Sequence, residues 1–250
     1  MKPVLTSLLA LCLTGTSVLA QDNAGTATPP APARSSSSDD GVRLGLKVAP
    51  NFHWLRPDTK GLESDGNNTG LSFGIVVDFP FGDNGQYAFH TGALLNYIGG
   101  PLKADYSTDT STVVSTQDTK LRYVEIPLCL KLRTRMDQPL NFYGQLGVSA
   151  AINVRARSDF ETTTTILGNN VTASDTDVDI IDDVQAFKMA LVAGAGVELT
   201  LDSGPTLFGG IVYNNGLMNV LQGDAKYIVN EDKKSKLFAD YLEISLGVYL

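Results

Sequence analysis

Cysteine and histidine are both scarce in this chain of 250 residues, with two of each. Cys12 lies in an apolar N-terminal segment that we expect to be removed, so Cys129 is the only cysteine of the expected mature chain. A single cysteine excludes an intramolecular disulfide and a cysteine-based metal site. Metal-binding and catalytic hypotheses therefore depend on His53, His90 and the carboxylates.

Basic residues are fewer than acidic residues in this chain. The chain has 19 lysines and arginines against 27 aspartates and glutamates, which gives a formal net charge of -8 and an isoelectric point near 4.7. Nucleic-acid binding depends on basic side chains that neutralise phosphates. We therefore expect no nucleic-acid partner.

Long apolar runs are confined to the N-terminus. Lys2 precedes the uncharged apolar stretch 4–19, and Val18 and Ala20 are the small residues expected before a cleavage site. This pattern predicts a secretory signal peptide over residues 1–20, with an uncleaved signal anchor as the alternative. The later uncharged stretch 203–223 is rich in glycine and asparagine, which suits a strand and a loop better than a membrane helix.

Residues 21–41 are rich in proline, alanine, serine and threonine. Such a composition offers too little apolar surface to offset the entropy of ordering the chain, so it predicts a flexible leader. The remaining residues, 42–250, would then form a single domain.

Within that domain, apolar and polar residues alternate with a period of two in eight segments. This alternation predicts strands with one apolar and one polar face. The expected strands are 42–55, 70–79, 87–98, 120–133, 140–155, 186–201, 206–214 and 238–250.

The connections between these segments alternate in length. The long ones are 56–69, 99–119, 156–185 and 215–237, and the short ones are 80–86, 134–139 and 202–205. Outer-membrane barrels combine long outer loops with short periplasmic turns in this way. A soluble β-sandwich also has strands with alternating apolar and polar residues, but its fold does not require long and short connections to alternate.

Aromatic residues occur at both ends of the apolar faces. Trp54, Tyr97 and Tyr213 lie next to long connections, and Phe79 and Phe142 lie next to short ones. Two aromatic girdles mark the two interfaces of a membrane barrel. We therefore predict an all-β fold, an up-and-down eight-stranded antiparallel transmembrane β-barrel with an N-terminal signal peptide. Its location would be the bacterial outer membrane, with both termini periplasmic and the long loops extracellular.

The polar faces would point into a lumen that eight strands make just wide enough for side chains. Charges of both signs fall on these faces and should pair, so we expect a plug held by hydrogen bonds rather than an open channel. The charge network predicted to fill the lumen, with a structural role, consists of Arg43, Lys47, Asp78, Glu125, Lys131, Lys188, Glu198 and Glu243. Arg155 is expected to point inward with them. Pro127 has no amide hydrogen and should mark a bulge or a missing ladder bond.

The segment 121–133, LRYVEIPLCLKLR, resembles the Tyr-x-Glu-Ile-Pro-Leu-x-Leu-Lys stretch of the PorT-like outer-membrane barrels of Bacteroidetes. Segments 145–153, 213–219 and 244–249 are similar to other parts of that family. The resemblance covers about residues 42–250 and implies an outer-membrane barrel. Such chains usually end in phenylalanine, whereas this one ends Tyr249–Leu250. The family is named after a component of a secretion and gliding system.

The function that we expect is a non-enzymatic envelope protein that presents surface loops. The partners would be outer-membrane lipid, lipopolysaccharide and other envelope proteins. The alternative implied by the resemblance is an accessory role in protein secretion or gliding. A lipid-modifying enzyme and a small pore are further alternatives. We expect no cofactor and no catalytic residue.

The connection 156–185 is the most acidic, with aspartates at 175, 177 and 179. An EF-hand loop would need Gly at its sixth position and Glu at its twelfth, where this chain has Ile180 and Ala186. We interpret the segment as a solvated loop, with loose binding of divalent ions as the alternative.

Overall fold

A computed structural model describes residues 41–58, 61–82, 85–107, 111–134, 139–166, 169–202, 204–222 and 236–250. They belong to the second of the two compact units into which the chain divides, Ser38–Leu250. The predicted signal peptide, 1–20, and all but the last residue of the predicted leader, 21–41, lie outside the described residues.

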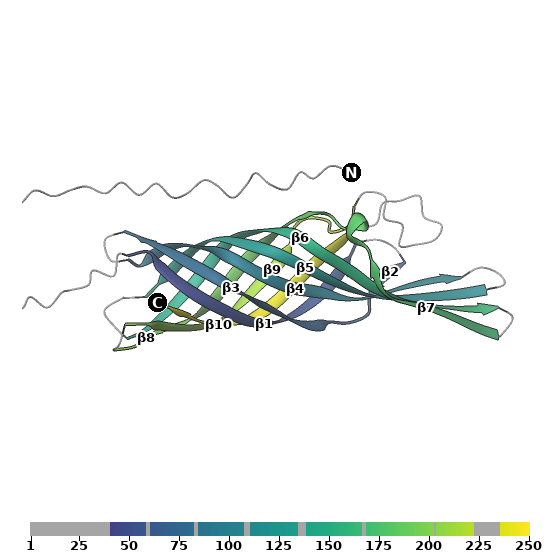
Figure 1. Cartoon of the computed structure of the whole chain (residues 1–250), viewed down its shortest axis with the longest axis horizontal. Helices are drawn as coiled ribbons and strands as arrows, with labels where there is room; N and C mark the ends of the chain where they lie inside the picture. Colours follow the sequence, from purple (N-terminus) through teal and green to yellow (C-terminus); the bar gives the residue numbers. More distant parts are fainter. Residues whose placement is uncertain are drawn as a thin grey trace, which may run out of the picture. The chain divides into compact units, whose positions relative to one another are not determined.

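The described residues form a ten-stranded antiparallel sheet with one short 3-10 helix, η1 (Ile181–Asp183). Figure 1 shows the strands inclined around a common interior. The strands are β1 (Arg43–Pro57), β2 (Leu62–Ser64), β3 (Asn68–Phe81), β4 (Tyr87–Ser107), β5 (Ser111–Arg133), β6 (Leu140–Ile166), β7 (Asn169–Asp179), β8 (Phe187–Thr200), β9 (Thr206–Gly216) and β10 (Leu237–Tyr249). No helix in this part of the chain is long and apolar enough to cross a membrane.

The strand pairing closes on itself. β3 pairs with β1, β1 with β10, and the order continues through β9, β8 and β6 to β5, while β4 pairs with both β3 and β5. Every strand in this cycle therefore has a hydrogen-bonded neighbour on each side, and neighbours follow one another in sequence once β2 and β7 are set aside. Closure removes the free sheet edges that an open sheet of this size would have.

The prediction of eight strands differs from the ten that are found. The two additional strands, β2 and β7, lie in segments that were expected to be loops, 56–69 and 156–185. The expected loop 99–119 is also largely strand, because β4 and β5 continue through it as a long hairpin. Threonine and valine, which favour strands, fill much of these segments, as in Thr162–Thr165.

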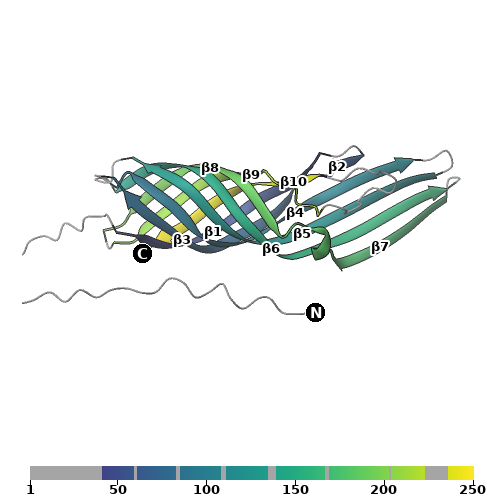
Figure 2. The same ribbon diagram turned by 90° about the horizontal axis from the view of Figure 1, so that it is seen from above.

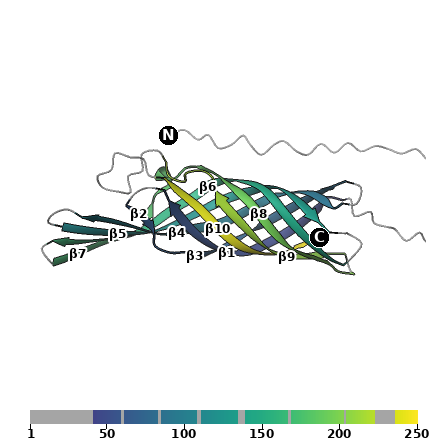
Figure 3. The ribbon, with the colours of Figure 1, turned by 180° about the vertical axis from the view of Figure 1, so that it is seen from behind.

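The ends of β4, β5 and β6 continue beyond the other strands and add β2 and β7 in the order β2-β4-β5-β6-β7. We call this part the sheet extension. Figures 2 and 3 show it as long strand pairs at one end of the unit. Almost every residue of β7 is exposed, and β7 pairs with β6 alone among the described strands.

Burial in the closed part is inverted relative to a soluble protein. Along β5 the odd-numbered residues from Leu121 to Arg133 are buried, while Val124, Ile126 and Leu130 are exposed. Leu146 is 59% exposed on the outside, whereas Lys131 is 1% exposed on the inside. An outer face covered with exposed apolar side chains indicates contact with an apolar environment.

Pro127 interrupts one ladder only. The β4–β5 pairing runs from Thr91 opposite Leu128 to Leu94 opposite Glu125, with no paired residues between them, while the β5–β6 register is continuous through Pro127. A proline has no amide hydrogen to donate, which accounts for the gap on the β4 side.

Gly247 illustrates how tightly the interior is filled. A Cβ at this position would collide with the Phe208 ring and with the Leu46 carbonyl oxygen. Phe208 in turn packs on the Tyr249 ring at a centroid distance of 4.8 Å. The absence of a side chain at 247 is therefore what allows Phe208 to occupy the interior.

We predict that Gly247→Ala lowers the free energy of unfolding by about 1–3 kcal/mol, because the added methyl group overpacks the interior. Gly41→Ala is the control, since a Cβ there meets nothing within 4 Å. Urea titration in lipid vesicles, followed by the emission of Trp54, the single tryptophan, measures both. Equal stability of the two variants would contradict the packing described for Gly247.

Candidate functional site

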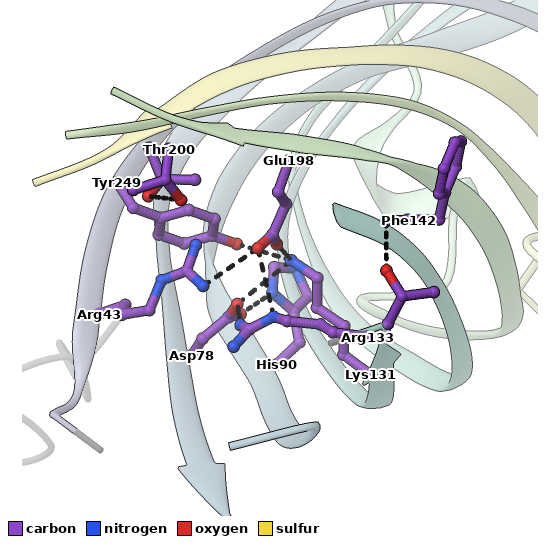
Figure 4. Close-up of polar contacts among 11 residues, drawn as sticks. Arg43, Asp78, His90, Lys131, Arg133, Phe142, Glu198, Thr200 and Tyr249 are labelled. Atoms are coloured by element: carbon purple, nitrogen blue, oxygen red, sulfur yellow. Dashed lines mark hydrogen bonds and ion pairs between the residues drawn. The ribbon is translucent and has the colours of Figure 1, made fainter. Parts of the chain in front are cut away.

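The interior at the end with the short connections holds a dense group of charged side chains, which we call the ion-pair cluster. Figure 4 shows these side chains converging from β1, β3, β4, β5, β8 and β10. Each is almost completely buried. The cluster consists of Arg43, Asp78, His90, Lys131, Arg133, Glu198 and Tyr249.

Two carboxylates organise this cluster. Asp78 accepts from Lys131 at 3.2 Å, contacts His90 at 2.6 Å and forms an ion pair with Arg133. Glu198 lies 3.0 Å from Arg43 and 3.3 Å from Arg133, and it also pairs with Lys131. Each cation therefore faces at least one carboxylate, which offsets the cost of removing these charges from water.

Aromatic rings complete the cluster. The guanidinium of Arg43 lies 4.2 Å from the Tyr249 ring centroid, and Lys131 Nζ lies 4.2 Å from that of Tyr143. Lys131 also donates to the Tyr249 hydroxyl at 3.2 Å. Cations bind favourably over aromatic faces when they are shielded from water, so the rings help to hold Arg43 and Lys131.

Further along the interior, Lys47 on β1 pairs with Glu243 on β10. Beyond it, Glu125 accepts from the Tyr241 hydroxyl at 2.7 Å and from the Asn96 amide at 3.2 Å. Lys188 Nζ is 3.9 Å from Glu125, without a hydrogen bond to any described residue. It lies 5.2 Å from each of the Tyr123 and Tyr241 ring centroids.

The end with the long connections is filled differently, by apolar side chains that we call the apolar cap. Two segments outside the closed cycle, one around η1 and one after β9, meet through a bridge between Val184 and Leu221. The cap comprises Leu55, Leu62, Ile98, Leu102, Leu121, Tyr123, Ala151, Ala156, Ile180, Val184, Val220, Leu221, Leu237, Ala239 and Tyr241. Charged side chains therefore fill one end of the interior, and mainly apolar side chains fill the other, with Gln117 and Thr119 buried among them.

The eight residues of the predicted charge network all lie in the interior, but not in one cluster. Arg43, Asp78, Lys131 and Glu198 belong to the ion-pair cluster, whereas Lys47–Glu243 and Lys188–Glu125 are separate pairs. That these contacts are structural rather than functional stays a prediction.

Arg133 was missed by the sequence analysis, although it has the same parity as Lys131 and is fully buried between Asp78 and Glu198.

Arg155 is not in the interior, contrary to expectation. The β5–β6 register shifts between Arg122 and Tyr123, so that Arg155 is opposite Arg122 while Asn153 is opposite Tyr123. Val154 is thus an extra residue, and a bulge of this kind reverses the faces of the residues that follow it. Arg155 consequently lies on the same face as Arg157, and Ala156 between them is buried.

The two histidines lie in separate surroundings. His90 contacts Asp78 in the ion-pair cluster, and His53 contacts the Asn51 side chain at 2.8 Å. Both are buried, at 5% exposure. No group of three or more His, Cys, Asp or Glu side chains in the described ranges is arranged to hold a metal ion.

We predict that Glu125→Ala lowers the free energy of unfolding by about 3–5 kcal/mol, because it leaves Lys188 buried without its carboxylate. Asp105→Ala should change stability by less than about 0.5 kcal/mol, as at ordinary surface sites, because Asp105 is 58% exposed. Urea titration in lipid vesicles compares the two.

The double variant Glu125→Gln with Lys188→Met shows whether the lost stability comes from the broken ion pair or from the lost side-chain volume. Replacing both charges by neutral groups of similar size should restore most of the stability lost in Glu125→Ala. A double variant as unstable as Glu125→Ala would contradict the role assigned to this ion pair.

Three solved structures show what the chain resembles. Neisserial surface protein A matches with 14% identity and a TM-score of 0.40, covering 84% of this chain and 98% of its own. OprG of Pseudomonas aeruginosa matches with 14% identity and a TM-score of 0.38, covering 82% and 94%. Ail, the attachment invasion locus protein of Yersinia pestis, matches with 11% identity and a TM-score of 0.32, covering 83% and 98%. The comparison with curated proteins gave no match.

A family assignment does not depend on these distant similarities. The outer membrane protein beta-barrel domain matches residues 20–222, which is most of the chain. The match includes β1 to β9 and therefore most of the closed strand cycle. Antiparallel strands with an apolar outer face and a charged interior agree with such a domain. The chain belongs to the outer membrane protein beta-barrel domain family.

Proposed function

We propose that this protein is a non-enzymatic outer-membrane barrel with a closed interior, which carries the sheet extension on the cell surface. The eight strands of the closed cycle, β1, β3, β4, β5, β6, β8, β9 and β10, would span the bilayer. The single observation that carries this proposal is the inverted burial, with Leu146 exposed outside and Lys131 buried inside. An apolar outer face is stable in hydrocarbon, and a closed strand cycle satisfies the backbone there.

The proposed orientation follows from the lengths of the connections. Short connections and both ends of the strand cycle, Arg43 and Tyr249, lie at the end that we assign to the periplasm. The sheet extension lies at the opposite end and would be extracellular, as the long loops of such barrels are. A predicted signal peptide over residues 1–20 would direct export.

The interior argues against transport as the main activity. The ion-pair cluster fills one end and the apolar cap fills the other, and their side chains are almost completely buried. An open pore needs a water-filled lumen, which narrow eight-stranded barrels lack. A lipid-modifying enzyme would need a nucleophile and a base accessible from the membrane, whereas His53 and His90 are both buried.

The sheet extension is the part best suited to contact partner proteins. β7 is exposed along its length, and it carries Asp175, Asp177 and Asp179. The partners that we propose are outer-membrane lipid and lipopolysaccharide around the barrel, and envelope proteins at the extension. Acidic residues on an exposed strand also discourage unspecific edge-to-edge pairing.

The alternative proposal is an accessory role in protein secretion or gliding, similar to that implied for PorT-like barrels of Bacteroidetes. The specific observation in its favour is the segment 121–133, LRYVEIPLCLKLR, whose Glu125 is a central interior carboxylate. Deleting the gene and assaying export and surface movement separates the two proposals. Normal export and movement would favour the structural envelope role, and loss of either would favour the secretion role.

We predict that a cysteine at Thr172 on β7 reacts with a membrane-impermeant maleimide on intact cells, because β7 would be extracellular. A cysteine at Asp202, in the short connection after β8, should react only after the outer membrane is permeabilised. Cys129→Ala provides the background for both variants, since Cys129 is buried but is the one cysteine of the described residues.

The reverse pattern, with Asp202→Cys labelled on intact cells and Thr172→Cys silent, would invert the orientation. Labelling of neither position after permeabilisation would contradict an exposed extension. Heat-modifiable migration in gels confirms that each variant is folded before labelling is compared.

A further inference from the structure

A cavity of about 400 Å³ lies at the base of the sheet extension, and residues of β1, β3, β4, β5, β6 and β7 line it, including His53 and Asp177. Basic side chains from two neighbouring strands contribute to its lining: Lys120 and Arg122 from β5, and Arg155 and Arg157 from β6. The strand register pairs them directly, with Lys120 opposite Arg157 and Arg122 opposite Arg155. Like charges directly opposite one another destabilise a sheet, so this arrangement needs compensation.

Two of the four cations are compensated by carboxylates of the extension. Lys120 pairs with Asp159 at 2.5 Å, and Arg157 pairs with Asp177. The hydrogen bond to Asp159 raises the pKa of Lys120 and lowers that of Asp159. Asp118, the remaining acidic neighbour, accepts from the Asn68 amide at 2.9 Å.

Arg122 and Arg155 lack such compensation. Arg122 lies over the Tyr97 ring, with its guanidinium carbon 4.8 Å from the ring centroid. Neither arginine forms an ion pair with a carboxylate within the described ranges, and both are half-buried. The bulge at Val154 is what turns Arg155 to the outer face opposite Arg122. Two half-buried arginines on paired strands, opposite one another and lining one cavity, form a suitable site for an anion that both can bind.

The position of the pair indicates where that anion comes from. The next outward-facing pair along the same strands toward the short-connection end is Val124 opposite Ile152, and both are exposed apolar residues. Tyr97 also stacks on Phe73 on the outer face, at a centroid distance of 6.3 Å. Aromatic residues mark the membrane–water interface, where lipid headgroups lie. Arg122 and Arg155 therefore lie at headgroup depth if the proposed membrane placement holds.

We propose that Arg122 and Arg155 form a binding site for the phosphate group of an outer-leaflet lipid, with Tyr97 beside it. The planar guanidinium groups bind the phosphate oxygens through paired hydrogen bonds, and the cavity receives the adjoining polar headgroup. The bound phosphate neutralises two like charges that the sheet otherwise holds opposite one another. This inference rests on the proposed membrane location and adds a specific lipid contact to it.

The experiment uses the full mature chain in detergent micelles and native mass spectrometry to count retained lipid. The probes are bisphosphorylated lipid A, the same lipid without phosphates, and inorganic phosphate alone. We expect the wild type to retain the bisphosphorylated lipid, and the double variant Arg122→Gln, Arg155→Gln to retain about tenfold less, a difference corresponding to about 1.4 kcal/mol. The control Lys103→Gln removes a cation of the extension that does not line the cavity, and it should behave as the wild type.

The outcomes answer two questions: whether the two arginines bind phosphate at all, and whether that phosphate belongs to a lipid. Retention that requires the lipid phosphates and is little affected by inorganic phosphate supports a lipid headgroup. Binding of inorganic phosphate that depends on both arginines supports the phosphate site but overturns the assignment to a lipid. Equal retention by the wild type and the double variant overturns the site altogether.

A separate measurement tests whether the protein inserts into membranes, independently of whether it binds the lipid phosphate. Each protein is first tested for heat-modifiable migration and for insertion into lipid vesicles. A chain that does not insert contradicts the proposed function, whereas a chain that inserts and binds no phosphorylated lipid contradicts only the arginine site. The variant Arg122→Lys, Arg155→Lys keeps the charge but loses the paired geometry, so it should retain less lipid than the wild type.

Discussion

The pairing of β4 with β5 is the contact on which the other features depend, because it completes the strand cycle. Without it, β4 and β5 would each present a free edge, which hydrocarbon cannot satisfy with hydrogen bonds. Closure also fixes which residues face inward, since side chains alternate along each strand except where a bulge intervenes, as at Val154 in β6. The charged interior and the apolar outside are consequences of this one closed ladder.

Closure of the strand cycle removes the inward-facing charged side chains from water. Buried charges are costly unless they are paired, and the cluster around Asp78 and Glu198 pairs three cations with two carboxylates and adjacent aromatic rings. The long-connection end needs no such pairing because apolar side chains fill it. Charged side chains and apolar side chains thus occupy opposite ends of the same interior. The outer surface and the sheet extension are the regions that remain accessible to other molecules.

Strand positions and facing could be predicted because alternation is a local property of the sequence. The parity of strand 120–133 correctly placed Glu125 and Lys131 inside. The bulge at Val154 could not be predicted, because the residues that follow it, Arg155 to Ser158, carry no apolar alternation whose phase could reveal an inserted residue, and Arg155 was therefore expected inside. The strands of the sheet extension could not be predicted, because their threonines are neither apolar nor alternating and give no period-two pattern. The apolar cap arises from contacts such as Val184 with Leu221, which depend on closure and are not visible in local sequence.

A filled interior is the central claim, and ion conductance tests it most directly. Val184 and Leu221 of the apolar cap and Lys131 of the ion-pair cluster occupy the path that an ion would take. The measurement is single-channel recording of the full mature chain in planar lipid bilayers, with insertion verified by heat-modifiable migration of the recovered protein. This account predicts that the inserted protein gives no stable conductance steps. Regular, long-lived open steps from the inserted wild-type protein would contradict it.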